Sequence, residues 1–71
     1  MTRYLIIAEK TATGFSAYSP DLPGCVSTGA SPAEVEANMR HAVVGHLAEL
    51  REDGTIAPAP TSFATCIEVA A

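Results

Sequence analysis

The chain has 71 residues and a formal net charge of −4, and its basic residues, Arg3, Lys10, Arg40 and Arg51, are scattered along it. Phosphate backbones are bound by lysines or arginines gathered on one surface, so this distribution argues against direct nucleic-acid binding. A chain of this size has room for one small domain, residues 1–71, whose core is expected to need self-association or a partner for stability.

Neither a leader segment nor a metal or redox centre is expected. The first apolar run, residues 5–8, is too short for a signal-peptide core or a membrane span, so we expect a cytoplasmic protein. Cys25 and Cys66 lie far apart, with no Cys-x-x-Cys spacing and no neighbouring histidine. We therefore expect both to be buried apolar residues, with no metal and no cofactor.

Three short strands are expected in the first part of the chain. In residues 3–10, successive side chains would point to opposite faces of a strand, and both faces would carry apolar side chains. This is typical of a strand that is covered on both faces. After a polar loop ending at Gly14, residues 15–19 return as the second strand of a hairpin, and residues 26–30 supply the third.

A proline-rich corner, residues 20–24, joins the second and third of these strands. Pro23 and Gly24 provide the fixed φ and the positive φ of a type II turn. Asp21 is expected to accept backbone N–H bonds within the turn. For Leu22 and Pro23 two interpretations stay open, since the corner either sets the angle between strands or contacts a partner.

One amphipathic helix is expected from Ser31 to Asp53. Ser31 is a typical N-cap, Pro32 suits the first helical position, and Glu34 completes a Ser-x-x-Glu capping box. Gly54 is a typical stop signal. The apolar stripe consists of Val35, Met39, Ala42, Val43, Leu47 and Leu50. Gly45 interrupts this helix and is expected to allow the close approach of another backbone.

After a proline-rich connector, residues 63–69 alternate as a fourth strand. The expected fold is α+β, a small β-β-β-α-β sheet with one helix on one face. Since one helix cannot cover both faces, we expect a second subunit or another protein to bury the remaining apolar surface, as in a homo-oligomer that is a dimer or tetramer.

The order of the Pro-Asp-Leu-Pro-Gly-Cys corner, short strand, capped helix and Glu52-Asp53-Gly54 stop resembles the HicB family of antitoxins from toxin–antitoxin pairs. The resemblance implies a partial ribonuclease H-like fold. It also implies binding to HicA, a small basic toxin that resembles a double-stranded RNA-binding domain and cleaves mRNA with a histidine. Many family members continue into a C-terminal DNA-binding domain, whereas this sequence ends at Ala71, so we expect a short form without one.

The first hypothesis is therefore a non-enzymatic antitoxin that neutralises a HicA-like toxin. The second is an orphan HicB-like interaction module with a different partner. A third, a vestigial Mg²⁺-dependent nuclease, would need converging carboxylates, whereas Asp21, Glu34 and Glu36 are better explained as turn, cap and solvated residues. His41 and His46 are five residues apart on the helix, which is the wrong spacing for chelating one metal. The expected partner-binding residues are Asp21, Leu22, Pro23, Glu36, Glu49 and Glu52.

Overall fold

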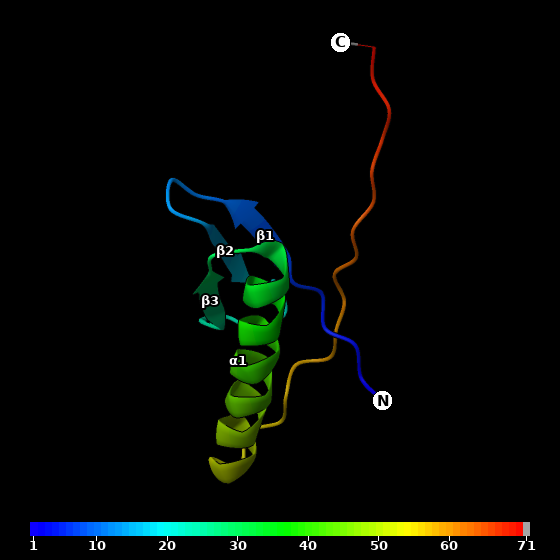
Figure 1. The fold of residues 1–71 in the computed structure, drawn as a ribbon. Coiled ribbons are helices and arrows are strands. Elements are labelled where there is room, and N and C mark those ends of the chain that lie inside the picture. The colour runs from blue at the N-terminus through cyan, green and yellow to red at the C-terminus, as the bar shows by residue number, and fades with distance from the viewer. Residues whose placement is uncertain (71) are drawn as a thin grey trace.

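Three antiparallel strands are followed by one long helix in the computed structural model, which describes residues 1–70 (Figure 1). Strand β1 spans Ile7–Lys10, β2 spans Phe15–Tyr18 and β3 spans Val26–Gly29. They form one sheet in the order β1-β2-β3, and helix α1, Pro32–Glu52, packs against one face of it. The predicted α+β class, with a single helix on one sheet face, is confirmed.

Strand β1 is shorter than the predicted strand over residues 3–10. Its ladder begins at Ile7, which lies opposite Tyr18, because β2 ends there and the chain turns away at Ser19. The Ser19 hydroxyl donates instead to the carbonyl oxygen of Leu5 at 2.9 Å. The segment before β1 therefore stays attached to the fold without a strand partner.

The core lies between the sheet and the helix. Its fully or nearly buried side chains come from β2, the proline corner and the first half of α1: Ala17, Leu22, Cys25, Val35 and Met39. Half-buried apolar side chains surround them, including Ala42, Val43 and Leu47 of the predicted helix stripe. So small a core leaves little margin of stability, which agrees with the expectation for a chain of this length.

The helix begins where the sequence predicts. The Ser31 hydroxyl accepts a hydrogen bond from the backbone N–H of Glu34 at 3.1 Å. The Glu34 carboxylate reaches back to the backbone N–H of Ala30 at 3.2 Å rather than to that of Ser31. The N-cap is thus confirmed, and the reciprocal bond of the capping box falls one residue earlier than expected.

The helix also ends as predicted, at Gly54, whose φ of 72° requires a residue without Cβ strain. The N–H groups of Gly54 and Thr55 donate to the carbonyls of Arg51 and Leu50, the pair of bonds that defines a Schellman motif. Gly45 behaves differently from expectation, because a Cβ at this position would meet no atom within 4 Å. Among residues 1–70, no backbone outside the helix itself approaches this position.

The sheet face turned away from α1 is uncovered. Ile7, Tyr18 and Val26 lie opposite one another across the three strands, and directly opposed residues point to the same side of a sheet. The neighbouring row contains the buried Ala17, so the Ile7 row faces outward. Tyr18 and Val26 are 41% and 65% exposed. The uncovered apolar surface that the sequence predicts is thus present but limited to this row, because the other outward-facing row of the sheet is polar and consists of Glu9, Ser16 and Thr28.

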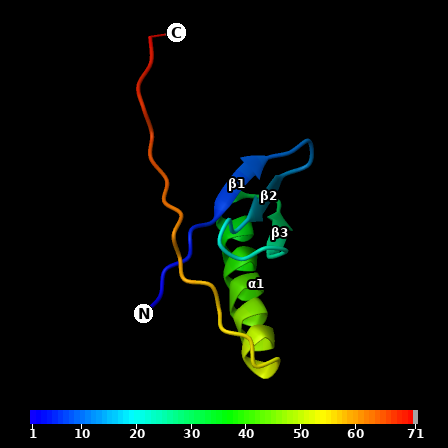
Figure 2. The ribbon, with the colours of Figure 1, turned by 180° about the vertical axis from the view of Figure 1, so that it is seen from behind.

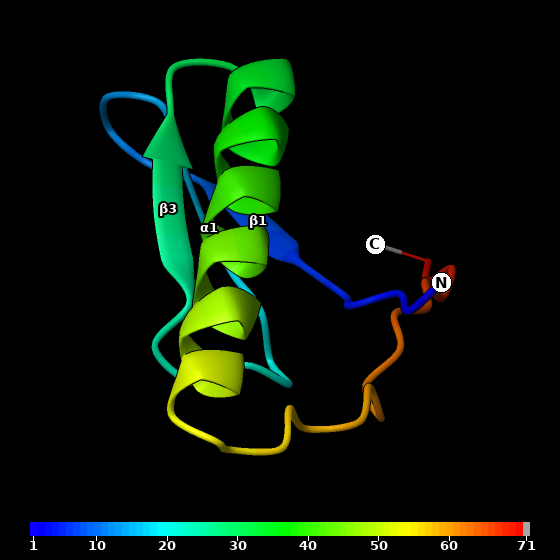
Figure 3. The same cartoon turned by 90° about the horizontal axis from the view of Figure 1, so that it is seen from below.

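The predicted fourth strand is not formed within this chain. Residues 55–70 lie in no helix or strand, and the stretch after residue 63 extends away from the sheet and helix, as Figures 1 and 2 show from opposite sides. The view from below in Figure 3 gives the same separation. A strand needs a neighbour to pair with, and residues 63–70 have none here. Cys66 on this segment is exposed, contrary to expectation, whereas Cys25 is buried as predicted.

Candidate functional site

The proline corner is a pair of consecutive turns closed by backbone hydrogen bonds. Leu22 N–H donates to the carbonyl of Ser19 at 3.2 Å, and Cys25 N–H donates to the carbonyl of Leu22 at 3.1 Å. Gly24, at the third position of the second turn, has a φ of 81° after Pro23. The predicted type II geometry is therefore confirmed, and Ser19 N–H, which donates to the Cys25 carbonyl at 3.2 Å, closes the base of the corner.

Two residues of the corner that were expected to contact a partner have different surroundings. Leu22 is 0% exposed and belongs to the core, so its side chain is not part of any surface that a partner touches. The corner joins the ends of β2 and β3 and points Leu22 inward, toward the other core residues. Pro23 is exposed on the outside of the same turn. Of the two interpretations, the structural one applies to Leu22, while Pro23 stays available for contact.

Asp21 binds the C-terminal segment instead of the turn backbone. Its carboxylate accepts hydrogen bonds from the Ser62 N–H at 3.1 Å, the Ser62 hydroxyl at 3.0 Å and the Thr61 hydroxyl at 3.1 Å. Desolvation raises the pKa of the Asp21 carboxyl, but the hydrogen bonds from Ser62 and Thr61 outweigh it and bring the pKa below its ordinary value. The predicted role of Asp21 within the turn is wrong, and its role is to hold residues 61 and 62.

The three helix carboxylates proposed from the sequence do not form one surface. Glu36 and Glu49 are thirteen residues apart, which separates their directions by roughly 140° around the helix axis. Glu36 borders a hollow beside β1 together with Arg3 and Arg40. Glu49 lies on the other flank of α1, and Glu52 follows it near the helix end, both exposed. The structure therefore splits the expected acidic face in two.

The flank of Glu49 faces the proline corner across a shallow depression, which we call the corner hollow. Its lining contains no lysine or arginine and consists of Gly24, Cys25, Val26, His41, Ala42, Gly45, His46 and Glu49. Burial raises the pKa of the Cys25 thiol, which keeps it protonated and unreactive. Within residues 1–70, no three histidine, cysteine or carboxylate side chains are placed to hold a metal ion. The corner hollow is thus a mixed surface, on which one carboxylate and two histidines accompany small and apolar residues.

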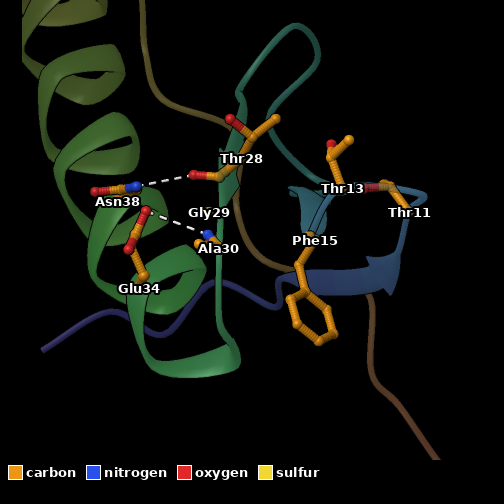
Figure 4. Close-up of a pocket in the computed structure, with 9 residues that line it drawn as sticks. Thr11, Thr13, Phe15, Thr28, Gly29, Ala30, Glu34 and Asn38 are labelled. Carbon is orange, nitrogen blue, oxygen red and sulfur yellow. Dashed lines mark hydrogen bonds between the residues drawn. The ribbon is translucent and has the colours of Figure 1, made fainter.

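A second hollow lies between the hairpin loop and the start of α1, and Figure 4 shows its lining. Its polar groups on the helix are already used, since Asn38 donates to the Thr28 carbonyl at 2.8 Å and Glu34 accepts from Ala30. Glu34 is the sole ionisable residue in the lining, which otherwise consists of Thr11, Thr13, Gly14, Phe15, Thr28, Gly29, Ala30 and Asn38. It therefore offers no nucleophile with a neighbouring base.

Two glycines shape this second hollow, and sequence reasoning missed them. A Cβ on Gly14 would lie 2.5 Å from the Gly29 carbonyl oxygen, and one on Gly29 would lie 2.5 Å from the backbone nitrogen of Val35. The hairpin loop, β3 and the first turn of α1 touch through bare backbone here. No local pattern signals this contact, because it depends on the strand register.

Among the described residues, no helix is long and apolar enough to cross a membrane.

Comparison with known proteins gives a consistent result. Residues 4–70 match the model of a family described as the HicB-like antitoxin of bacterial toxin–antitoxin systems. A chain in the solved structure of a HicA3 and HicB3 toxin–antitoxin complex is 33% identical, with a TM-score of 0.73. The match covers 84% of this chain and 70% of that one. Among curated proteins, none matches this chain.

Proposed function

Because this chain belongs to the family of HicB-like antitoxins, we propose that it is the antitoxin of a type II pair, binding and neutralising a small basic HicA-like toxin that cleaves mRNA. The observation that supports this most is the family match over nearly the whole chain, together with the likeness to a chain of a toxin–antitoxin complex. The protein would act in the cytoplasm, where the toxin meets mRNA, and would act by binding rather than by catalysis.

The charge of the chain supports a basic partner. The net charge is −4, and the helix presents carboxylates on both flanks. Opposite charge on two partners speeds their encounter and disfavours competing partners of the wrong sign. The same charge, with only scattered basic residues, supports a protein partner in preference to direct nucleic-acid binding.

We place the toxin contact on the corner hollow and its rim. Pro23 is a rigid exposed residue on one side, and Glu49 and Glu52 supply negative charge on the other. The flank of Glu36 is less suited, because Arg3 and Arg40 border the same hollow and would repel a basic partner. Asp21 contributes by holding the C-terminal segment, and Leu22 by packing the corner from inside.

A size-exclusion experiment with light scattering tests the proposal. The full chain would be measured alone and after co-expression with a small basic HicA-like protein, and a gene adjacent to that of this chain is the first place to look for it. We expect a homo-oligomer alone and a stable complex after co-expression. A homo-oligomer that leaves the neighbouring protein free would support the second candidate, an orphan module of the same fold with a different partner, which the uncovered Tyr18 and Val26 face would also suit.

A further inference from the structure

Residues 63–70, here called the C-terminal arm, have the sequence of a strand and the surroundings of a free end. Phe63, Ile67 and Val69 alternate along one side of it and are 84%, 82% and 72% exposed. Figures 1 to 3 show the arm leaving the folded part of the chain from three directions. Apolar side chains at period two on an unpaired extended segment are typical of a strand that completes its sheet elsewhere.

The root of the arm is fixed even though the arm is free. Asp21 holds Thr61 and Ser62, and the Tyr4 hydroxyl donates to the carbonyl of Pro58 at 2.7 Å. Pro58 and Pro60 favour extended backbone in the residues before them, so this connector does not readily turn back. Ser62 and Phe63 lie beside residues 3–6, and from there the arm diverges from β1 of its own chain.

The sheet has one edge that accepts a strand, and it is β1. The Thr11 N–H donates to the Gly14 carbonyl at 2.8 Å, so the backbone groups of Thr11 face β2. Because hydrogen-bonded and non-hydrogen-bonded pairs alternate along an antiparallel ladder, the backbone N–H and C=O groups of Ala8 and Lys10 point away from β2, toward the position that a neighbouring strand would occupy. The opposite edge, β3, is partly closed, because Asn38 donates to the carbonyl of Thr28. Next to the residues that precede β1, a hollow lies between residues 3–6 and α1, and its lining includes Tyr4, Ile6 and Met39.

From these features we infer that two copies of this chain exchange their C-terminal arms, each arm pairing with the β1 edge of the other copy. One chain supplies one free strand and one free edge, so a reciprocal exchange satisfies both in a closed twofold dimer. The apolar side of the arm then extends over the neighbouring hollow between residues 3–6 and α1. Glu68, the one charge on the arm, would come near Glu9 and Lys10 of β1, and the hollow before β1 carries Arg3, Arg40 and Glu36, so the cations there outnumber the carboxylates by one.

The exchange deepens the self-association included in the proposed function and does not depend on a toxin. It also separates two surfaces of the molecule. The second copy lies on the β1 side, where Glu36 is, and the corner hollow on the other flank of α1 stays free for a different protein. Antitoxin activity and arm exchange are therefore tested independently of each other.

The first test compares two exposed isoleucines. In the single chain Ile56 and Ile67 are 91% and 82% exposed, so neither Ile56→Glu nor Ile67→Glu should disturb folding, which circular dichroism would check. We expect Ile67→Glu to weaken the dimer by roughly a hundredfold or more in analytical ultracentrifugation, because each of two arms loses a buried side chain. Ile56→Glu should leave the dimer unchanged. A monomeric parent protein, or an Ile67→Glu dimer as tight as the parent, would overturn the inference.

The second test uses the natural thiol of the arm. Cys66 is exposed and Cys25 is buried, so Ala8→Cys or Lys10→Cys on the β1 edge gives Cys66 one new partner. Disulfides form only where the Cα atoms come within about 7 Å, so mild oxidation reads out proximity. We expect a covalent dimer with at least one of these variants and none after adding Cys66→Ser. A disulfide closed within one chain would show that the arm folds onto its own β1 and would contradict exchange. A variant made monomeric by Ile67→Glu that still binds the basic toxin would leave the antitoxin function intact.

Discussion

The Asp21 carboxylate and the backbone N–H of Ser62 are joined by a hydrogen bond of 3.1 Å across 41 residues of sequence. The proline corner thereby sets the point from which the C-terminal arm departs. The turn at the proline corner positions the Asp21 carboxylate, and Thr61 and Ser62, which are distant in sequence, donate hydrogen bonds to it. The proline corner thus has a structural task, which is to anchor residues 61 and 62.

The anchoring of residues 61 and 62 should depend on pH. The pKa of Asp21 is lowered in the folded chain, so this carboxylate contributes stability that is present above its unfolded pKa of about 3.9 and is lost as the pH falls through the lower folded value. A carbon-detected NMR titration should give a midpoint for Asp21 below about 3.9. The Ser62 amide should lose its hydrogen-exchange protection over the same range of pH.

The matched variant for this titration is Asp21→Asn. Its amide cannot carry the negative charge, so the bonds from Thr61 and Ser62 weaken, and Ser62 should already exchange fast at neutral pH. Protection within α1 should stay as in the parent protein. Unchanged protection of Ser62 in the variant would mean that the carboxylate does not hold the arm.

Leu22→Ala should destabilise the fold by about 2–5 kcal/mol, because it removes a fully buried side chain between the corner and the helix. That is comparable to the whole stability expected of a core this small. Val26→Ala, at an exposed position at the start of β3, just after the corner, is the matched control and should change the free energy of unfolding little. Urea unfolding followed by circular dichroism measures both, and equal midpoints would contradict the burial of Leu22.

Two glycine substitutions should have opposite effects. Gly29→Ala places a Cβ against the backbone of Val35 and should destabilise the protein by about 1–3 kcal/mol. Gly45→Ala meets no atom within 4 Å and should stabilise α1 by about 1 kcal/mol. Thermal unfolding of the two variants would show one lowered and one raised midpoint. A midpoint lowered by Gly45→Ala would indicate that another backbone approaches this glycine in the assembled protein.

Charge reversal on the two flanks of the helix distinguishes the proposed contact surface. Glu49→Lys should weaken binding to the basic toxin, because it places a like charge at the rim of the corner hollow. Glu36→Lys makes the same change in net charge on the flank that already contains Arg3 and Arg40, and should have the smaller effect. Association rates measured at low and moderate salt compare the two. A larger loss for Glu36→Lys would place the contact on the β1 side.

The local features of this chain are predictable from its sequence, whereas features that depend on distant residues are not. The Pro23-Gly24 turn, the Ser31 cap and the Gly54 stop each depend on residues only a few positions apart in sequence, and the structure contains all three. The inward direction of Leu22 and the bond from Asp21 to Ser62 depend on where the corner lies against the rest of the fold. Residues 63–69 have the pattern of a strand, but no pattern states which chain supplies the neighbour.

Neutralisation of a small basic ribonuclease by this chain is tested most directly by a cleavage titration. A small basic HicA-like ribonuclease would be incubated with mRNA while increasing amounts of the full chain are added. We predict that cleavage falls to background at a fixed molar ratio, and that Glu49→Lys needs more protein to reach the same point. Cleavage that continues undiminished in the presence of excess chain would contradict the antitoxin function.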